Sequence, residues 1–366
     1  MPSTQKIGFL VHSRDIKDLI RRFFILKFLP ESVVNFIALH LPPITVSNIT
    51  GLKNLDSSNI KGYIIGITMT AHQMIENREL ALKKIIKACQ YAEKKGVTLI
   101  GLGALTSSFS RGGLDILPHV KKLKITTGRA YTTKTVTDYV KHCIDRFNYD
   151  KSKVKLAIVG AGGSVGSSCA KLLALWGVKN ILLVDVQKRA ENLKRSLVHL
   201  LSENKDLNVE ISHSISQIKG SDIIITATNA PEAVLSSDDL SPGSIVVNDA
   251  QPSDVPDQVI LERSDILVIE GGIIHTPGIK CNFNLGLAHR EDTFCCLGEV
   301  LILARREHSD HYALGELDHN LVSQIEEMSH DLGFGISRLQ NSIQKYIPDD
   351  QIANVKSIIQ KKNLIG

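Results

Sequence analysis

The chain has 366 residues, of which 43% are apolar and 22% charged. This is more than one small hydrophobic core needs, so we expect two or more domains. Ordinary glycine and proline usage and a mean hydropathy of +0.03 exclude disordered and collagen-like chains. The net charge of +5 is too small for the strongly basic surface of nucleic-acid-binding proteins, so nucleic acid is not an expected partner.

The first 150 residues have the pattern of an α/β domain. Apolar, β-branched runs predict strands at 7–11, 62–67 and 97–102, and the charged amphipathic stretch 77–95 predicts a helix between the last two. The polar stretch 148–153 then predicts a domain boundary. We therefore expect an N-terminal α/β substrate domain over residues 1–150.

The N-terminal region also bears on targeting. The apolar run 7–11 is too short for a signal peptide, and no long apolar stretch runs without a charge, so we expect a cytoplasmic protein without a transmembrane segment. The most apolar stretch, 23–41, is broken by Lys27, Pro30 and Glu31. It predicts an interior helical pair, with an apolar surface for a greasy ligand as the alternative.

Residues 151–289 alternate short β-branched runs with stretches of helical composition. Helices are predicted at 167–176, closed by Gly177, and at 188–201. Strands are predicted at 154–159, 180–184, 208–212, 222–227, 244–248 and 265–269. This alternation predicts a doubly wound parallel sheet, a Rossmann dinucleotide-binding domain. Residues 290–366 predict a C-terminal helical region.

A glycine-rich segment follows the first of these strands directly and leads into a helix. Glycines let the backbone approach a pyrophosphate, and the free N–H groups and dipole of the helix start favour its charge. The segment therefore predicts a cofactor site. Its residues are Gly160, Ala161, Gly162, Gly163, Ser164, Val165 and Gly166.

Two residues near the next strand bear on the choice of cofactor. Asp185 lies 19 residues beyond Gly166, where a carboxylate accepts from the ribose 2′-hydroxyl, which favours NAD. Arg189 could instead clamp a 2′-phosphate, which favours NADP.

Two later turns are predicted to line the nicotinamide half of the site. Thr228 and Asn229 follow the fourth strand, and Gly271 and Gly272 follow the last. Ordinary turn chemistry is the alternative for both.

Six cysteines are scattered along the chain without a metal-ligand spacing, so we predict neither a disulfide framework nor a metal site. The pair Cys295-Cys296 is the best candidate for catalysis, because a thiolate can displace the carrier from a thioester and hold the acyl group for reduction. Adjacent helical residues point about 100° apart, so one of the two packs in the core. Packing of both is the alternative. Cys89, Cys143 and Cys169 are assigned to packing.

Over most of its length, the sequence resembles the long-chain acyl-carrier-protein reductases of cyanobacteria, which make fatty aldehydes. In that family a phenylalanine, a small residue, the nucleophilic cysteine and, three residues later, a glutamate occur together, which assigns the nucleophile to Cys296. The residues that carry the likeness are His12, Pro42-Pro43, Thr50-Gly51, 102–107, Thr126-Thr127-Gly128-Arg129, Tyr131-Thr132, the glycine-rich segment, Gly271-Gly272 and 294–299.

The resemblance implies further properties of the site. The N-terminal domain would hold the acyl chain, with Thr126, Thr127 and Gly128 contacting substrate or cofactor; a helix cap explains these three equally well. The expected cofactor is NADPH, with NADH as the alternative because of Asp185. Magnesium stimulation is also implied, although no carboxylate cluster defines a site.

The leading hypothesis is NAD(P)H-dependent reduction of a fatty acyl thioester to an aldehyde through an acyl-cysteine. The expected partner is acyl carrier protein or a coenzyme A thioester, and transient membrane contact is compatible with this activity. The alternatives are a shikimate-type alcohol dehydrogenase without a covalent step and a dinucleotide-binding sensor without turnover. The sequence does not predict the oligomeric state.

Overall fold

The computed structural model describes residues 5–13, 20, 24–230, 232–282 and 285–365. The chain separates into two compact units, each built from two segments. Unit 1 comprises Met1–Tyr131 and Ile274–Phe334, and unit 2 comprises Thr132–Ile273 and Gly335–Gly366. In the described part of the chain, no helix is long and apolar enough to cross a membrane.

Unit 1 contains a mixed six-stranded sheet. Strand β1 pairs in parallel with β3 and β4, and β4 with β5, whereas β2 is antiparallel to β3 and β13. The strands, in sheet order, are β13 (Lys280–Cys281), β2 (Ile44–Thr50), β3 (Lys61–Thr70), β1 (Lys6–Ser13), β4 (Leu99–Leu102) and β5 (Lys124–Thr126). Two shorter strands, β12 (Ile273–His275) and β14 (Asp292–Phe294), lie side by side.

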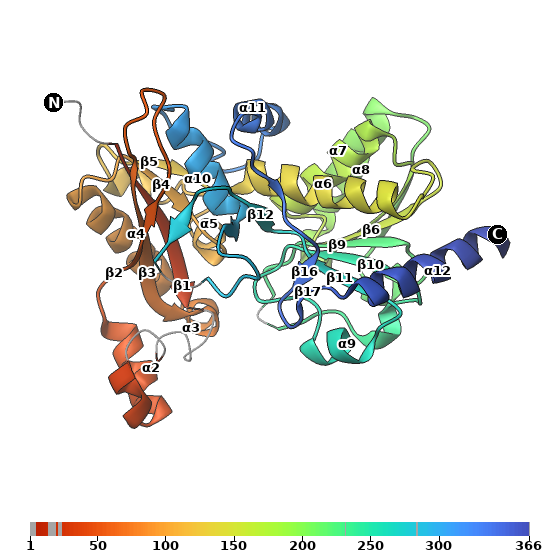
Figure 1. The fold of residues 1–366 in the computed structure, drawn as a ribbon, viewed down its shortest axis with the longest axis horizontal. Helices are drawn as coiled ribbons and strands as arrows, with labels where there is room; N and C mark the ends of the chain where they lie inside the picture. The colour runs from red at the N-terminus through yellow and green to blue at the C-terminus, as the bar shows by residue number, and fades with distance from the viewer. Residues whose placement is uncertain (1–4, 14–19, 21–23, 231, 283–284, 366) are drawn as a thin grey trace. The chain divides into compact units, whose positions relative to one another are not determined.

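Helices cover both faces of this sheet (Figure 1). Because side chains alternate between faces, Leu10 and Ile100 pack with Ile85 of α4, while Gly101 faces Val300 of α10; a Cβ on Gly101 would lie 2.2 Å from Val300 Cγ2. The helices of unit 1 are α2 (Glu31–His40), α3 (Ala71–Glu76), α4 (Arg78–Lys94), α5 (Leu105–Phe109), α10 (Cys295–Arg305) and α11 (His319–Ser329).

Unit 2 contains a parallel six-stranded sheet that confirms the predicted Rossmann fold. Every predicted strand is present, with ends within two residues of the prediction. In sheet order the strands are β11 (Leu267–Glu270), β10 (Ile245–Asn248), β9 (Ile223–Thr226), β6 (Lys155–Val159), β7 (Asn180–Val184) and β8 (Asn208–Ser212). The chain reverses its direction of winding between β6 and β9, which is where such sheets bind their ligands.

Alternate side chains of each strand point to opposite faces of the sheet and pack in two separate hydrophobic cores. Ile158 and Ile225 pack in the core that contains α7, whereas Val159 and Ile224 pack in the core that contains α9, so helices cover both faces (Figure 1). The helices are α6 (Arg129–Arg146), whose first three residues belong to unit 1, α7 (Ser164–Trp176), α8 (Ala190–Glu203), α9 (Asp257–Glu262) and α12 (Asp349–Ile365). Short strands β15 (Gly335–Ile336), β16 (Gln340–Asn341) and β17 (Lys345–Tyr346) also lie in this unit.

The units divide the chain differently from the predicted ranges 1–150, 151–289 and 290–366. Most of α6 lies in unit 2, and α10 and α11 return to unit 1. The predicted C-terminal helical region is therefore shared: α10 and α11 belong to unit 1, and α12 to unit 2. The α/β fold class itself, with helices near the C-terminus, is confirmed.

The apolar stretch 23–41 is not an interior helical pair. Phe23 lies outside the described residues; the rest forms a short 3-10 helix, η1 (Phe24–Phe28), and α2. Phe24, Phe28 and Phe36 are 67%, 74% and 63% exposed, while Leu26, Val34 and Ala38 form a small core. The alternative, an apolar surface, agrees with this exposure.

Candidate functional site

The glycine-rich loop joins β6 to α7 in a conformation that side chains would obstruct. Gly160 has φ +88°, and a Cβ there would lie 2.5 Å from Ala227 O. A Cβ on Gly166 would lie 2.5 Å from Gly160 O. Both positions therefore require glycine, and the loop packs closely against the end of β9.

The start of α7 has the features of an anion site. Its N-cap residue, Gly163, provides no side-chain cap, so the first backbone N–H groups are available to a ligand. The Ser164 hydroxyl is buried and has no hydrogen-bond partner among the described residues. A cofactor pyrophosphate would satisfy these donors, so the residues present fit a dinucleotide.

Asp185 and Arg189, the two residues predicted to bear on cofactor choice, both contact the glycine-rich loop. Asp185 Oδ2 accepts from Gly162 N at 2.9 Å, and Oδ1 accepts from Val186 N at 2.8 Å. Arg189 Nη1 donates to Gly162 O at 3.3 Å. The Gly162 backbone thus contacts both a carboxylate, which favours a ribose hydroxyl, and a guanidinium, which favours a 2′-phosphate. The choice between NADH and NADPH stays a prediction.

The two predicted nicotinamide turns lie at the carboxyl edge of the sheet. Thr228 Oγ1 donates to Asp254 Oδ1 at 2.5 Å, and this hydrogen bond stabilises the turn. Gly271 N donates to Asn248 O at 2.7 Å, and Gly272 follows it. Asn229 is exposed at the same edge.

An acidic cluster at this edge was not predicted. Burial raises the pKa of Glu270 to about 7, although Asn248 and Gln251 donate hydrogen bonds to its carboxylate. Burial, with the nearby Glu270 and Asp254 carboxylates, raises the pKa of Asp249 to about 8. A carboxyl group with a pKa near neutrality can donate a proton at physiological pH. The signal in the sequence was the polar pair Asn248-Asp249, which follows the apolar run 245–247.

The cysteines divide by burial. Cys89, Cys143 and Cys169 are fully buried, and Cys295 is 3% exposed, as the predicted packing roles require. Burial raises the pKa of Cys89 and Cys143 to about 12 and that of Cys281 to about 11. The remaining thiol, Cys296, is partly exposed in the first turn of α10. Its assignment as the nucleophile stays a prediction.

Cys296 packs directly on the predicted substrate loop. A Cβ on Gly128 would lie 2.3 Å from Cys296 Cβ, so the loop closes against α10 because residue 128 has no side chain. Glu299, the next turn of α10, is completely buried and accepts from Gly128 N at 2.9 Å and Tyr131 N at 2.8 Å. Its carboxylate thereby caps the start of α6.

The neighbouring threonines already have internal partners. Thr126 donates to Glu299, and Thr127 Oγ1 donates to Ala313 O at 2.6 Å. Both side chains are buried, so they hold the loop, and a role in substrate contact stays a prediction. Burial raises the pKa of Glu299, which these hydrogen bonds only partly oppose.

Part of the chain matches the model of a known protein family. The model of the ornithine cyclodeaminase/mu-crystallin family matches residues 122–301, which run from β5 through the glycine-rich loop to α10. Aminotransferase PigE of a Serratia species is 22% identical over 312 residues, covering 84% of this chain and 36% of PigE. The chain thus spans about a third of the length of that relative.

Two further proteins are similar. The long-chain acyl-[acyl-carrier-protein] reductase of Synechococcus elongatus is 24% identical over 273 residues, covering 71% of this chain and 75% of that protein. The crystal structure of shikimate 5-dehydrogenase from Listeria monocytogenes, in complex with shikimate and NAD, is 14% identical with a TM-score of 0.36, covering 74% of this chain and 88% of that one.

The assignment to the acyl-carrier-protein reductases is wrong. The matching family model is a different one, and the similarity to the Synechococcus reductase is weak and partial. Unit 2 has the fold and the glycine-rich loop of a dinucleotide-binding domain, as predicted. With the family match, it indicates an oxidoreductase of the NAD(P)-dependent dehydrogenase and reductase type.

Proposed function

We propose that the protein is an NAD(P)H-dependent reductase that converts an acyl thioester to an aldehyde through an acyl group held on Cys296. The observation that carries this proposal is the position of Cys296, partly exposed in the first turn of α10 with Gly128 closed against it. The carrier of the acyl group is an acyl carrier protein or coenzyme A.

Cys296 performs the first step. Its sulfur attacks the thioester carbonyl carbon, and as the new carbon–sulfur bond forms, the bond to the carrier sulfur breaks and the carrier leaves as a thiol with one proton. Phe294, the N-cap residue of α10, makes no side-chain cap, and the helix dipole stabilises negative charge near the first turn. Aldehyde release breaks the bond to Cys296 and restores its thiol.

The cofactor supplies the reducing equivalents. When bound, NAD(P)H supplies the hydride that takes the acyl group to the oxidation level of an aldehyde, and one proton is consumed with it. The residues that would hold it are the glycine-rich loop with Ser164, together with Asp185 and Arg189. Glu299 and Gly128 act on the other reactant, because they fix the loop that packs on Cys296.

Acyl labelling without cofactor tests the proposal. Incubation with an acyl-coenzyme A should add one acyl mass to the peptide that contains Cys296, and Cys296→Ala should abolish it. Cys281→Ala is the matched control, because Cys281 is also partly exposed in unit 1 and should keep full labelling. Cys295→Ala separates the two thiols of the same peptide. Labelling that survives Cys296→Ala would falsify the proposal.

A second candidate is a dehydrogenase without a covalent intermediate, such as one of the shikimate type. The partial family match and the raised pKa of Asp249 favour it. Asp249 would donate the proton that converts a carbonyl to an alcohol while the cofactor supplies the hydride. Full turnover by Cys296→Ala with loss of activity in Asp249→Asn would support this candidate, whereas cofactor binding without turnover on either substrate class would indicate a sensor.

A further inference from the structure

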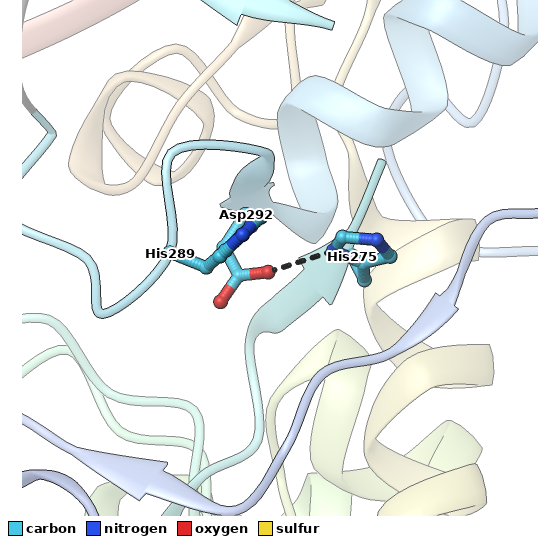
Figure 2. A group of neighbouring side chains, drawn as sticks. All are labelled: His275, His289 and Asp292. Atoms are coloured by element: carbon cyan, nitrogen blue, oxygen red, sulfur yellow. Dashed lines mark hydrogen bonds and ion pairs between the residues drawn. The ribbon is translucent and has the colours of Figure 1, made fainter. Parts of the chain in front are cut away.

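Three side chains of unit 1 come together where β12 ends and β14 begins. His275 is the last residue of β12, and Asp292 is the first residue of β14. His289 lies in the turn before β14, where Asp292 N donates to His289 O at 3.2 Å. Figure 2 shows the Asp292 carboxylate directed at the His275 ring, with His289 on the adjoining turn.

The distances suit a shared ligand. One potential ligand atom from each residue lies within 4.8 Å of those of the other two. His275 Nδ1 is 3.1 Å from Asp292 Oδ1, and the two imidazole ring centroids are 5.4 Å apart. Two neighbouring strands and the turn before β14 therefore place two imidazoles and one carboxylate around one point.

The burial of the group favours a cation. The Asp292 side chain is only 1% exposed and that of His275 38%, while His289 lies at the surface. A carboxylate removed from water is costly unless positive charge balances it. The exposed side of the cluster leaves a path for an ion and its water.

We propose that His275, His289 and Asp292 form a Zn²⁺ site. Two imidazole nitrogens and one carboxylate oxygen are typical zinc ligands, whereas magnesium and calcium select oxygen ligands. Three protein ligands leave the fourth tetrahedral position to water. Glu291 lies on the other side of the His275 ring, with Oε2 4.0 Å from His275 Nε2 and Oε1 accepting from Gly278 N at 3.0 Å.

Binding requires a small local adjustment. Zinc bonds of about 2.0–2.1 Å hold tetrahedral ligand atoms roughly 3.3 Å apart, so the most distant pair of ligand atoms must approach by at most about 1.5 Å. The exposed His289 ring can supply this movement. It gives up the contact in which Glu291 N donates to His289 Nδ1 at 3.2 Å, and the ion replaces the hydrogen bond between His275 and Asp292.

Zinc titration of the untagged full-length chain tests the site. After chelator treatment and dialysis, calorimetry with ZnCl₂ should show one saturable site per chain, and Co²⁺ should give the visible absorption of a tetrahedral complex. His289→Ala and Asp292→Asn should each weaken Zn²⁺ binding at least about tenfold. His289 is exposed, so its variant should remain folded even if Asp292→Asn does not.

The matched control is His72→Ala. His72 is an exposed histidine of unit 1 that lies 3.4 Å from Glu76, and its removal should leave the Zn²⁺ affinity unchanged. Absence of a saturable site, or unchanged affinity in His289→Ala, would overturn the proposal and leave His275 and Asp292 as a hydrogen-bonded pair.

Discussion

Gly128 occupies a position that only glycine fills without strain. Its φ is +77°, and a Cβ would lie 2.3 Å from Cys296 Cβ. We expect Gly128→Ala to destabilise unit 1 through two separate costs, the left-handed backbone at about 1–2 kcal/mol and a steric clash of about 1–3 kcal/mol more. Urea unfolding measures the sum.

Gly278→Ala isolates the backbone cost. Gly278 has nearly the same φ, +78°, but no atom of the described residues lies within 4 Å of its added Cβ. The clash at Gly128 therefore appears as the difference in unfolding free energy between the two variants. Equal losses of stability would contradict the close packing of this loop on α10.

Asp249 makes stability depend on pH. Its pKa rises from 3.8 to about 8, so the folded protein holds a proton that the unfolded chain releases above about pH 4. The stability that this proton contributes is fully present below about pH 4 and is lost as the pH rises through about 8. Asp249→Asn, which cannot ionise, should gain stability relative to the native chain as the pH rises across this window, as urea unfolding at several pH values would show. A difference independent of pH would rule this out.

The residues of the candidate sites differ in how readily the sequence alone identifies them. The glycine-rich loop was predictable because strand, glycines and helix are contiguous. The grouping of Thr126–Gly128 with Cys296 came only from a resemblance. Asp249 and the cluster of His275, His289 and Asp292 could not be predicted, because their partners lie on separate strands and only the folded sheets bring them together.

Helix α2 carries two kinds of apolar side chain. Val34 is 1% exposed and packs with Leu26 and Ala38, whereas Phe36 is 63% exposed. We expect Val34→Ala to cost about 2 kcal/mol, since it leaves a cavity, and Phe36→Ala to change stability by less than about 0.5 kcal/mol. Thermal unfolding of the two variants checks this. A large loss for Phe36→Ala would mean that the phenylalanine is covered in solution.

Among the secondary-structure elements, the strands of unit 2 were easier to predict from the sequence than the burial of apolar side chains on helices. β6 to β11 are short and, except for β8, mostly apolar, so composition located most of them. The stretch 23–41 is equally apolar, yet its phenylalanines are exposed, because composition does not reveal whether a partner surface exists. The three-residue strand β5 is too short to show a pattern.

Each unit has its own core, so cofactor binding should stabilise unit 2 selectively. Trp176, at the end of α7, is the only tryptophan of the chain, and its fluorescence therefore reports on unit 2. NAD(P)H at 100 times its Kd should stabilise unit 2 by about 2.7 kcal/mol and shift the unfolding transition seen by fluorescence. An unchanged transition at saturating cofactor would argue against the glycine-rich loop as the binding site.

The division into units was the least predictable property. Local patterns placed boundaries near 150 and 290, where composition changes. The return of α10 to unit 1 depends instead on Val300 packing against Gly101, two residues nearly 200 positions apart in the sequence. Long-range contacts of this kind leave no local signal.

Because each unit is built from two segments that are separated in the sequence, the order of synthesis affects co-translational folding. The ribosome completes residues 132–273, all six strands of the second sheet, before it reaches α10, which covers β1 and β4 of the first. At about 5–20 residues per second, the face of the nascent first sheet that α10 later covers lacks that helix for roughly ten to thirty seconds. During that interval Gly101 and its neighbours have no Val300 to pack against, so the unfinished sheet exposes apolar surface of the kind that is prone to aggregate.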